Sequence, residues 1–224
     1  MFNKSPKKAV VVLGGELIGG CWVKDILKSS DIIVAADNGI SHCIKLGVEP
    51  DISVGDFDSI LPKNLTAAKK LGWEIKQFPE DKDKTDGQLA VEEALNLGAE
   101  TITVIAGIRG DSRFDHGLGN ILLLTYKHLA YKDIRLIEKN IEISLITSAA
   151  PHPLNYLKNS IVSLIPLTDP VKGVKTKGLK YNLSTEDLNM GHTRGISNII
   201  LKDDATISVL DGLLLVILEK SNLP

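Results

Sequence analysis

The sequence predicts an α/β fold, a mostly parallel sheet with flanking helices, followed by a small all-β domain. Short, continuous apolar runs such as Ala9–Leu13 and Ile32–Ala36 alternate with amphipathic segments, which is the pattern of βαβ units. Beyond residue 150 the helical segments stop, and short β-like runs separated by turn residues follow. We therefore expect an α/β domain over residues 1–150 and a β domain over residues 155–224.

Each expected element rests on its own apolar pattern. In the first domain the expected strands are Ala9–Leu13, Ile32–Ala36, Ile52–Val54, Glu74–Phe78, Thr101–Ala106, Ile134–Ile137 and Ile141–Ile146. The expected helices are Trp22–Lys28, Ser41–Leu46, Lys63–Leu71, Gln88–Leu97 and Leu118–Leu129. In the tail we expect strands at Ile161–Pro166, Val171–Thr176, Ile196–Leu201, Thr206–Leu210 and Leu213–Leu218. Asp211-Gly212 predicts a hairpin between the last two.

Composition excludes several classes of protein. The formal net charge of −2 gives no general electrostatic reason to bind nucleic acid or an anionic membrane. Cys21 and Cys43 form no Cys-x-x-Cys pair, which suits a reducing compartment and excludes a zinc ribbon. The apolar run after the first lysines, residues 9–13, is too short for a signal peptide or a membrane span. We expect a cytoplasmic protein with no nucleic-acid or membrane partner.

Carboxylates gather where predicted strands end. Asp56 and Asp58 follow the run ending at Val54, and Asp86 stands at the start of a predicted helix. Two like charges about 4 Å apart cost roughly 4 kcal/mol at an effective dielectric of 20. Any one of these residues alone is readily explained as a solvated loop acid. Together they indicate a divalent cation such as Mg²⁺, which binds carboxylate oxygens and shares its other positions with water and substrate phosphates.

Turns after the first two strands allow two interpretations each. Gly14-Gly15 fits neither the dinucleotide fingerprint nor the Walker pattern, so it is either a tight turn or a phosphate loop. Asp37 either accepts hydrogen bonds from a nucleotide sugar or caps the next helix. The histidines show no metal-ligand spacing, and we interpret His42, His128, His152 and His192 as structural or exposed.

Two further stretches suit phosphate groups. Thr85 and Gln88 form a capping box, and the backbone N–H groups at a helix start attract phosphates. Arg109 and Arg113 lie in a glycine-rich loop and can grip phosphate oxygens with paired N–H donors. Asp115 either caps the helix that follows or binds a metal or ligand.

These motifs, in this order, resemble the thiamine pyrophosphokinase family. The family more often has Gly in place of Asn38 and Trp in place of Tyr181, although Tyr also offers a π face to the cationic thiazolium. The matching segments are Ala36–Gly39, Gly55–Ser59, Asp81–Asp86, Arg109–Asn120, Gly178–Leu183 and Ser197-Asn198.

The resemblance implies an enzyme that transfers the pyrophosphoryl group of ATP to the hydroxyl of thiamine, giving thiamine diphosphate and AMP. It implies a catalytic α/β domain that binds ATP and Mg²⁺, a β-sandwich that binds thiamine, and a homodimer with thiamine bound where the subunits meet. The implied catalytic and metal-binding residues are Asp56, Asp58 and Asp86. The implied ATP-side residues are Asp37, Lys82, Thr85, Arg109, Arg113, Asp115, His116 and Asn120, and those near thiamine are Tyr181, Ser197 and Asn198.

Two other functions stay open. A Mg²⁺-dependent phosphohydrolase also uses paired aspartates, and it would release phosphate from ATP without an acceptor. A non-catalytic module would bind nucleotide or thiamine and form no AMP.

Overall fold

A computed structural model describes residues 5–108, 113–155 and 158–220, whose helices and strands form two units. The first, here the α/β unit, comprises the chain up to Leu123 together with Lys132–Lys139. The second, the β unit, comprises Leu124–Tyr131 and the chain from Asn140 onwards. In the described part of the chain, no helix combines the length and the apolar character needed to cross a membrane.

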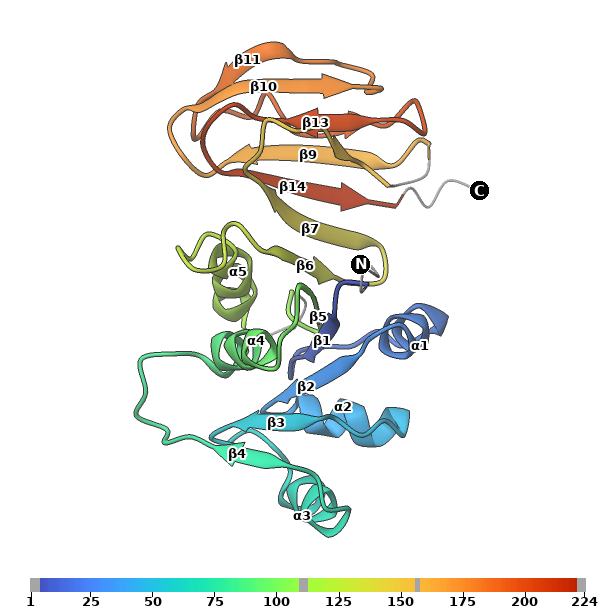
Figure 1. Ribbon diagram of the computed structural model, residues 1–224, viewed down its shortest axis with the longest axis vertical. Coiled ribbons are helices and arrows are strands. Elements are labelled where there is room, and N and C mark those ends of the chain that lie inside the picture. Colours follow the sequence, from blue (N-terminus) through green and yellow to red (C-terminus); the bar gives the residue numbers. More distant parts are fainter. Residues whose placement is uncertain (1–4, 109–112, 156–157, 221–224) are drawn as a thin grey trace. The chain divides into compact units, whose positions relative to one another are not determined.

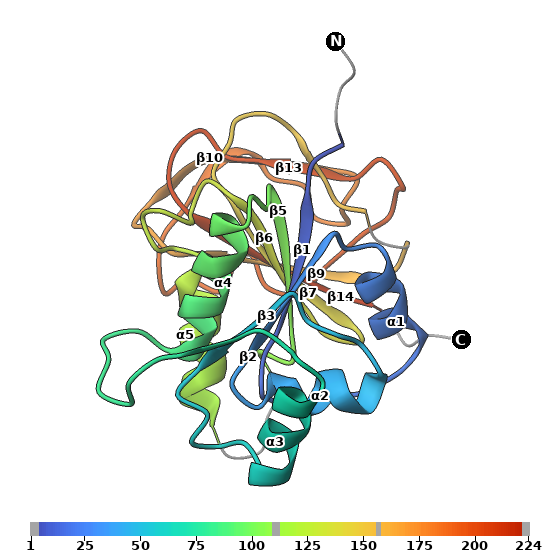
Figure 2. The same cartoon turned by 60° about the horizontal axis from the view of Figure 1, so that its bottom comes forward.

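The α/β unit contains a parallel sheet in the order β6-β5-β1-β2-β3-β4 (Figure 1). Helices α4 and α5 cover one face, and α1 and α2 lie on the other (Figures 1 and 2). The strands are β1 Lys8–Val12, β2 Ile32–Ala36, β3 Ile52–Gly55, β4 Ile75–Gln77, β5 Thr101–Ile105 and β6 Asp133–Ile137. The helices are α1 Cys21–Lys28, α2 Gly39–Leu46, α3 Pro62–Lys70, α4 Asp86–Asn96 and α5 Phe114–Leu123. The strand order reverses between β1 and β5, and doubly wound sheets bind ligands at such a point.

Buried side chains hold β1 and α2 together in the core of the α/β unit. Val11 and Val12 of β1 are fully buried, as a central parallel strand covered on both faces requires. The start of α2 lies directly against the end of β1, where a Cβ added to Gly39 would lie 2.1 Å from the Val12 oxygen. Cys43 of α2 is buried in this core, and burial raises the pKa of its thiol to about 12. The thiol therefore stays protonated and acts as a packing group.

The structure confirms the predicted strands and helices of the α/β unit, with one clear difference. The helix expected at Leu118–Leu129 begins earlier, at Phe114, and ends at Leu123. Beyond it the chain turns, and the N–H groups of Leu129 and Ala130 donate to the Tyr126 oxygen. Leu124 and Leu129, which belong to the β unit, are buried, so the apolar run beyond the helix reflects burial and not helix formation.

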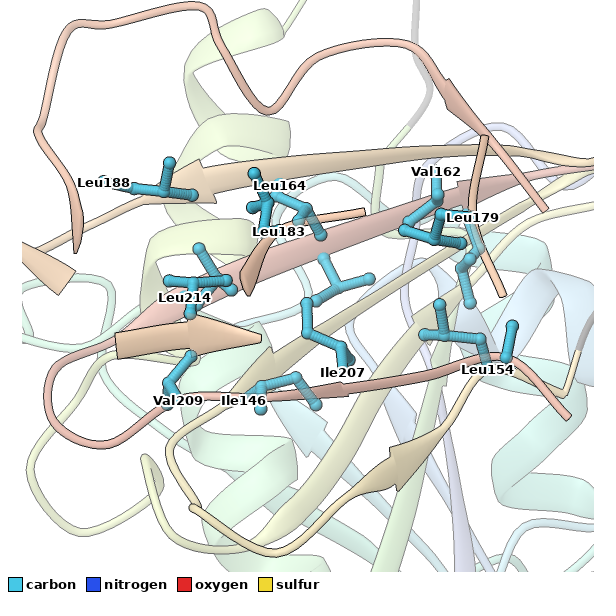
Figure 3. Close-up of a cluster of buried hydrophobic side chains, with 14 of the residues drawn as sticks. Ile146, Leu154, Val162, Leu164, Leu179, Leu183, Leu188, Ile207, Val209 and Leu214 are labelled. Carbon is cyan, nitrogen blue, oxygen red and sulfur yellow. The ribbon is translucent and has the colours of Figure 1, made fainter. Parts of the chain in front are cut away.

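The β unit consists of two antiparallel sheets in the orders β12-β9-β14-β7 and β11-β10-β13-β8. Buried aliphatic side chains from strands of both sheets, such as Val162 of β9 and Ile207 of β13, form one core (Figure 3). This confirms the predicted fold class, an α/β domain followed by an all-β sandwich. The strands are β7 Ile141–Ile146, β8 His152–Pro153, β9 Ile161–Pro166, β10 Val171–Lys177, β11 Ser184–Leu188, β12 Asn198–Ile199, β13 Thr206–Ser208 and β14 Leu214–Glu219.

The predicted hairpin at Asp211-Gly212 is wrong. Strand β13 pairs with β10 and β8, whereas β14 pairs with β7 and β9, so this turn connects the two sheets. The turn packs against the start of β10 and the residues before it: the Asp211 oxygen accepts from the Lys172 N–H at 2.8 Å, and a Cβ on Gly212 would lie 2.5 Å from Thr168 Oγ1. The glycine is needed there for close approach and for its φ of +104°.

Four other strands of the β unit differ from expectation, among them the two-residue β8, which was not predicted. β7, expected at the end of the α/β region, pairs with β14, so the β unit resumes at Asn140, ahead of the boundary expected near 150. The segment Ile196–Leu201 contributes only the short β12. β11 was not predicted because, apart from the buried Leu188, its residues are polar.

Candidate active site

A cavity of about 810 Å³ lies at the carboxyl ends of the parallel strands, within the α/β unit. Its walls come from the segments after β1, β2, β3, β4 and β5, from α2, and from the N-terminal parts of α4 and α5. The cavity therefore lies at the reversal of strand order, where the fold predicts a ligand.

Three aspartates form a group on its wall. Asp37, Asp56 and Asp58 each offer a carboxylate oxygen, and these oxygens all lie within 4.8 Å of one another. Asp37 Oδ1 is buried and has no hydrogen-bond partner among the described residues, while Oδ2 accepts from the Ser59 hydroxyl. Burial raises the pKa of Asp37, an effect that the Ser59 bond opposes and the nearby Asp58 and Asp56 reinforce. Hard oxygen donors grouped in this way, one of them unsatisfied, fit Mg²⁺ or Mn²⁺.

Lys82 lies between two carboxylates beside this group. Its Nζ contacts Asp56 Oδ2 and lies 3.2 Å from Asp86 Oδ1. All three side chains are largely buried, with 13%, 11% and 22% of the Lys82, Asp56 and Asp86 side chains exposed. Asp86, predicted as a metal ligand, is thus paired with Lys82, and the third member of the described aspartate group is Asp37. The role of Asp86 as a metal ligand stays a prediction.

The two aspartates beside Lys82 differ in their acidity. The Lys82 hydrogen bond lowers the pKa of Asp56, whereas burial raises that of Asp86 despite the same lysine. Burial alone would lower the pKa of Lys82, but its bonds to Asp56 and Asp86 outweigh burial and raise it. Lys82 therefore remains a cation at neutral pH and reduces the repulsion among the acids.

The backbone that carries the aspartates is strained where the strands end. Asp37, Phe57 and Ala106 have φ values of 46°, 63° and 57°, and they follow β2, β3 and β5. Such left-handed conformations cost non-glycine residues about 1–3 kcal/mol each and cluster at functional sites. By contrast, Asn38 has an ordinary φ of −64°, so its replacement of the family's usual glycine causes no strain.

His42 also lines the cavity, which sequence reasoning missed. Its Nε2 lies 2.8 Å from the Gly15 oxygen, and the Gly15 N–H donates to the Ala106 oxygen at 3.0 Å. The turn after β1 is therefore held by α2 and by β5. Burial lowers the pKa of His42. The one feature of the sequence that could have placed His42 at the cavity is its position one helical turn after Asn38.

The starts of α4 and α5 supply the remaining polar groups. Thr85 Oγ1 accepts from the Gln88 N–H at 3.2 Å, which confirms Thr85 as the N-cap of α4. Arg113 pairs with Asp115 through two bonds of 3.1 and 3.0 Å, and this pairing lowers the pKa of Asp115 to about 2.

The structure brings most of the predicted ATP-side residues to this cavity. Asp115 is not among the described residues that line it, and Arg109 lies outside the described residues. Those that line it are Asp37, Lys82, Thr85, Arg113, His116 and Asn120.

The residues expected near thiamine lie in the β unit. Tyr181 is 63% exposed, and Lys180 Nζ lies 5.3 Å from the centroid of its ring. Asn198 is buried: its Oδ1 accepts from the N–H groups of Tyr181 and Ile199, and its Nδ2 donates to the Tyr181 oxygen at 2.7 Å. Asn198 thus fixes the backbone that presents the tyrosine. Ser197 is exposed, and its N–H donates to Ser163 Oγ.

Comparison with known proteins finds the same family over both units. A family model for the thiamin pyrophosphokinase catalytic domain matches residues 23–137, and one for the thiamin pyrophosphokinase vitamin B1 binding domain matches residues 150–214.

Individual relatives agree. Thiamine pyrophosphokinase of Bacillus subtilis is 31% identical over 185 residues, 82% of this chain and 85% of that protein. The crystal structure of the enzyme from B. subtilis superposes with a TM-score of 0.84 at 28% identity, covering 97% of this chain and all of that one. The structure of a thiamin pyrophosphokinase family protein from Enterococcus faecalis gives 0.80 at 25% identity, covering 96% of this chain and all of that one.

Proposed function

This chain belongs to the thiamine pyrophosphokinase family, and we propose that it transfers the pyrophosphoryl group of ATP to the primary hydroxyl of thiamine. The thiamine oxygen bonds to the β-phosphorus as the bond between that phosphorus and the oxygen bridging it to the α-phosphate breaks, and the bridging oxygen leaves as part of AMP. The observation that carries the proposal is the aspartate group of Asp37, Asp56 and Asp58 in a cavity that also holds Lys82 and Arg113.

The cavity suits a nucleotide in size and in chemistry. Its volume of about 810 Å³ lies within the range of small-molecule sites, roughly 300–1,000 Å³. The N-terminus of α4 directs N–H groups and a partial positive charge at it, which suits phosphates. Arg113, which immediately precedes α5, and His116 and Asn120 of that helix add side-chain donors.

We propose that Asp56 and Asp58 hold Mg²⁺ together with a third carboxylate. The geometry supports Asp37 as the third, and the family resemblance supports Asp86. When bound, the ion supplies positive charge to the phosphate oxygens and acts as a Lewis acid.

Positioning and electrostatics account for most of a phosphoryl-type transfer, and the side chains present supply both. Lys82 holds Asp56 and Asp86 in place and keeps a positive charge in the cavity. Asp58 or Asp86 would orient the thiamine hydroxyl and accept its proton as the new O–P bond forms.

We propose further that Tyr181 stacks on the cationic thiazolium of thiamine, with Ser197 and Asn198 close by. Of these, the exposed Tyr181 is available for direct contact, and the Asn198 amide binds the tyrosine's backbone N–H and C=O. Following the family, the enzyme would work as a homodimer with thiamine bound where the subunits meet.

An assay of AMP formation from Mg–ATP, with and without thiamine, tests the function. The proposal predicts AMP and thiamine diphosphate only when thiamine is present. Phosphate release without thiamine would favour a phosphohydrolase, and saturable ATP binding without any AMP would favour a non-catalytic module.

A further inference from the structure

Glu138 is a buried carboxylate outside every motif of the family resemblance. It directly follows β6, and only 3% of it is exposed. Its Oε1 accepts hydrogen bonds from two consecutive backbone N–H groups, those of Gly107 at 3.2 Å and Ile108 at 3.4 Å. A buried carboxylate is costly unless it is hydrogen-bonded, so its position calls for a reason.

The segment that Glu138 binds is also held from the opposite side. Asn120 Nδ2 of α5 donates to the Gly107 oxygen at 2.8 Å, so side chains bind both the N–H and the C=O of Gly107. Ile108 packs directly on α5, because a Cβ on Gly117 would lie 2.8 Å from the Ile108 oxygen. Gly107 and Ile108 are therefore clamped between the end of β6 and the helix α5.

This clamp affects the nucleotide cavity in two ways. Consecutive N–H groups after a strand of such a sheet commonly bind phosphate, but here a carboxylate of the protein uses them. On this side of the cavity, phosphates must then be bound by side chains: Arg113, which immediately precedes α5, and His116 of its first turn both line the cavity. Gly117 of that turn packs directly against the clamped Ile108.

We propose that Glu138 is a positioning residue for ATP: it fixes Gly107 and Ile108, and through them the first turn of α5, which presents the phosphate-binding side chains. This inference rests on the proposed function, since it assigns ATP to the cavity. It also predicts that thiamine binding depends little on Glu138.

Substitutions at Glu138 test the inference against a matched core control. E138A removes the acceptor, E138Q keeps an oxygen acceptor at the same place, and L136A removes a buried side chain from the same strand without touching the clamp. The measurements are the Kd for Mg–ATP by calorimetry without thiamine, the KM for each substrate, and the Tm. We expect E138A to raise the Kd and KM for ATP about tenfold or more, as a misplaced binding group does. The KM for thiamine should change less than about twofold, and E138Q should recover most of the ATP affinity.

Three results would overturn the inference. These are an unchanged ATP Kd in E138A, an equal rise in both KM values, and the same loss of ATP affinity in L136A at a similar drop in Tm. Because the Kd is measured without turnover, it tests the clamp even if the wild-type protein forms no AMP. That outcome would refute the proposed function alone.

Discussion

Polar side chains act in opposite ways in the cavity of the α/β unit and at the Tyr181 loop of the β unit, which comprises residues 178–183 between β10 and β11. In the cavity, Asp37 keeps a buried carboxylate oxygen that has no hydrogen-bond partner among the described residues. At the loop, both polar atoms of the Asn198 amide of β12 bind backbone, and Tyr181 remains exposed. We infer that the first region receives ions and that the second presents an aromatic surface. Changes in the cavity should therefore reduce turnover, and changes in the loop should reduce affinity for one substrate.

The largest effect is expected from D56N and D58N. Each removes a charge from the aspartate group, and because a bound metal contributes several kcal/mol to the transition state, turnover should fall at least about 10³-fold. The fold should persist, with circular dichroism like that of the wild type. AMP formation at saturating Mg²⁺ is the measurement.

D81N is the matched control, because Asp81 is exposed and not among the described residues that line the cavity. It should keep a near-normal rate. A D58N variant that also keeps a near-normal rate would remove the contrast between the two regions.

A smaller, selective effect is expected from Y181A. Losing a cation–π contact worth about 0.5–2 kcal/mol should raise the thiamine KM roughly 2- to 30-fold, and the ATP KM less. Steady-state kinetics in both substrates measure it. Y131A, which changes another highly exposed tyrosine of the β unit, should leave both KM values unchanged. Equal rises in both KM values for Y181A would count against stacking.

The smallest effect concerns the pH dependence of stability through His42. Burial lowers its native pKa, so the unfolded chain takes up the proton more readily. The stability that neutral His42 contributes is therefore complete above its unfolded pKa of about 6.5, and it is lost as the pH falls through the lower native pKa. Removing its bond to Gly15 in H42A should cost about 1 kcal/mol, or 2–4 °C in Tm, at pH 7.5.

Thermal unfolding between about pH 5 and pH 8 measures this dependence. The gap in Tm between wild type and H42A should narrow at the acid end. H192A, at an exposed histidine, should show no such gap. A difference in Tm between wild type and H42A that does not change with pH would contradict the assignment of this pH dependence to His42.

Some residues of the site could be predicted from the sequence and others could not, for a physical reason. Asp56 and Asp58 could be placed because the carboxyl ends of parallel strands share one edge, so a position after a buried run fixes where a side chain lies. Glu138 and His42 could not, since their importance depends on backbone groups from distant segments, such as Gly107 and Gly15.

In the β unit the pairing of short strands is set by tertiary packing. The turn at Asp211-Gly212 has the residues of a hairpin, yet its packing against Thr168 and Lys172 sends the two flanking strands to different sheets. β7 illustrates the same limit, because its apolar run fits a strand of either unit.

The central claim is that Asp37, Asp56 and Asp58 share one divalent cation, and titration of the ligand-free protein with Mn²⁺ tests it most directly, with the free ion followed by electron paramagnetic resonance. The account predicts one tightly bound Mn²⁺ per chain in the wild type and in D81N, and an affinity at least about tenfold lower in D58N. A wild-type protein that binds no Mn²⁺ saturably, or a D58N variant that binds it as tightly as the wild type, would contradict the account.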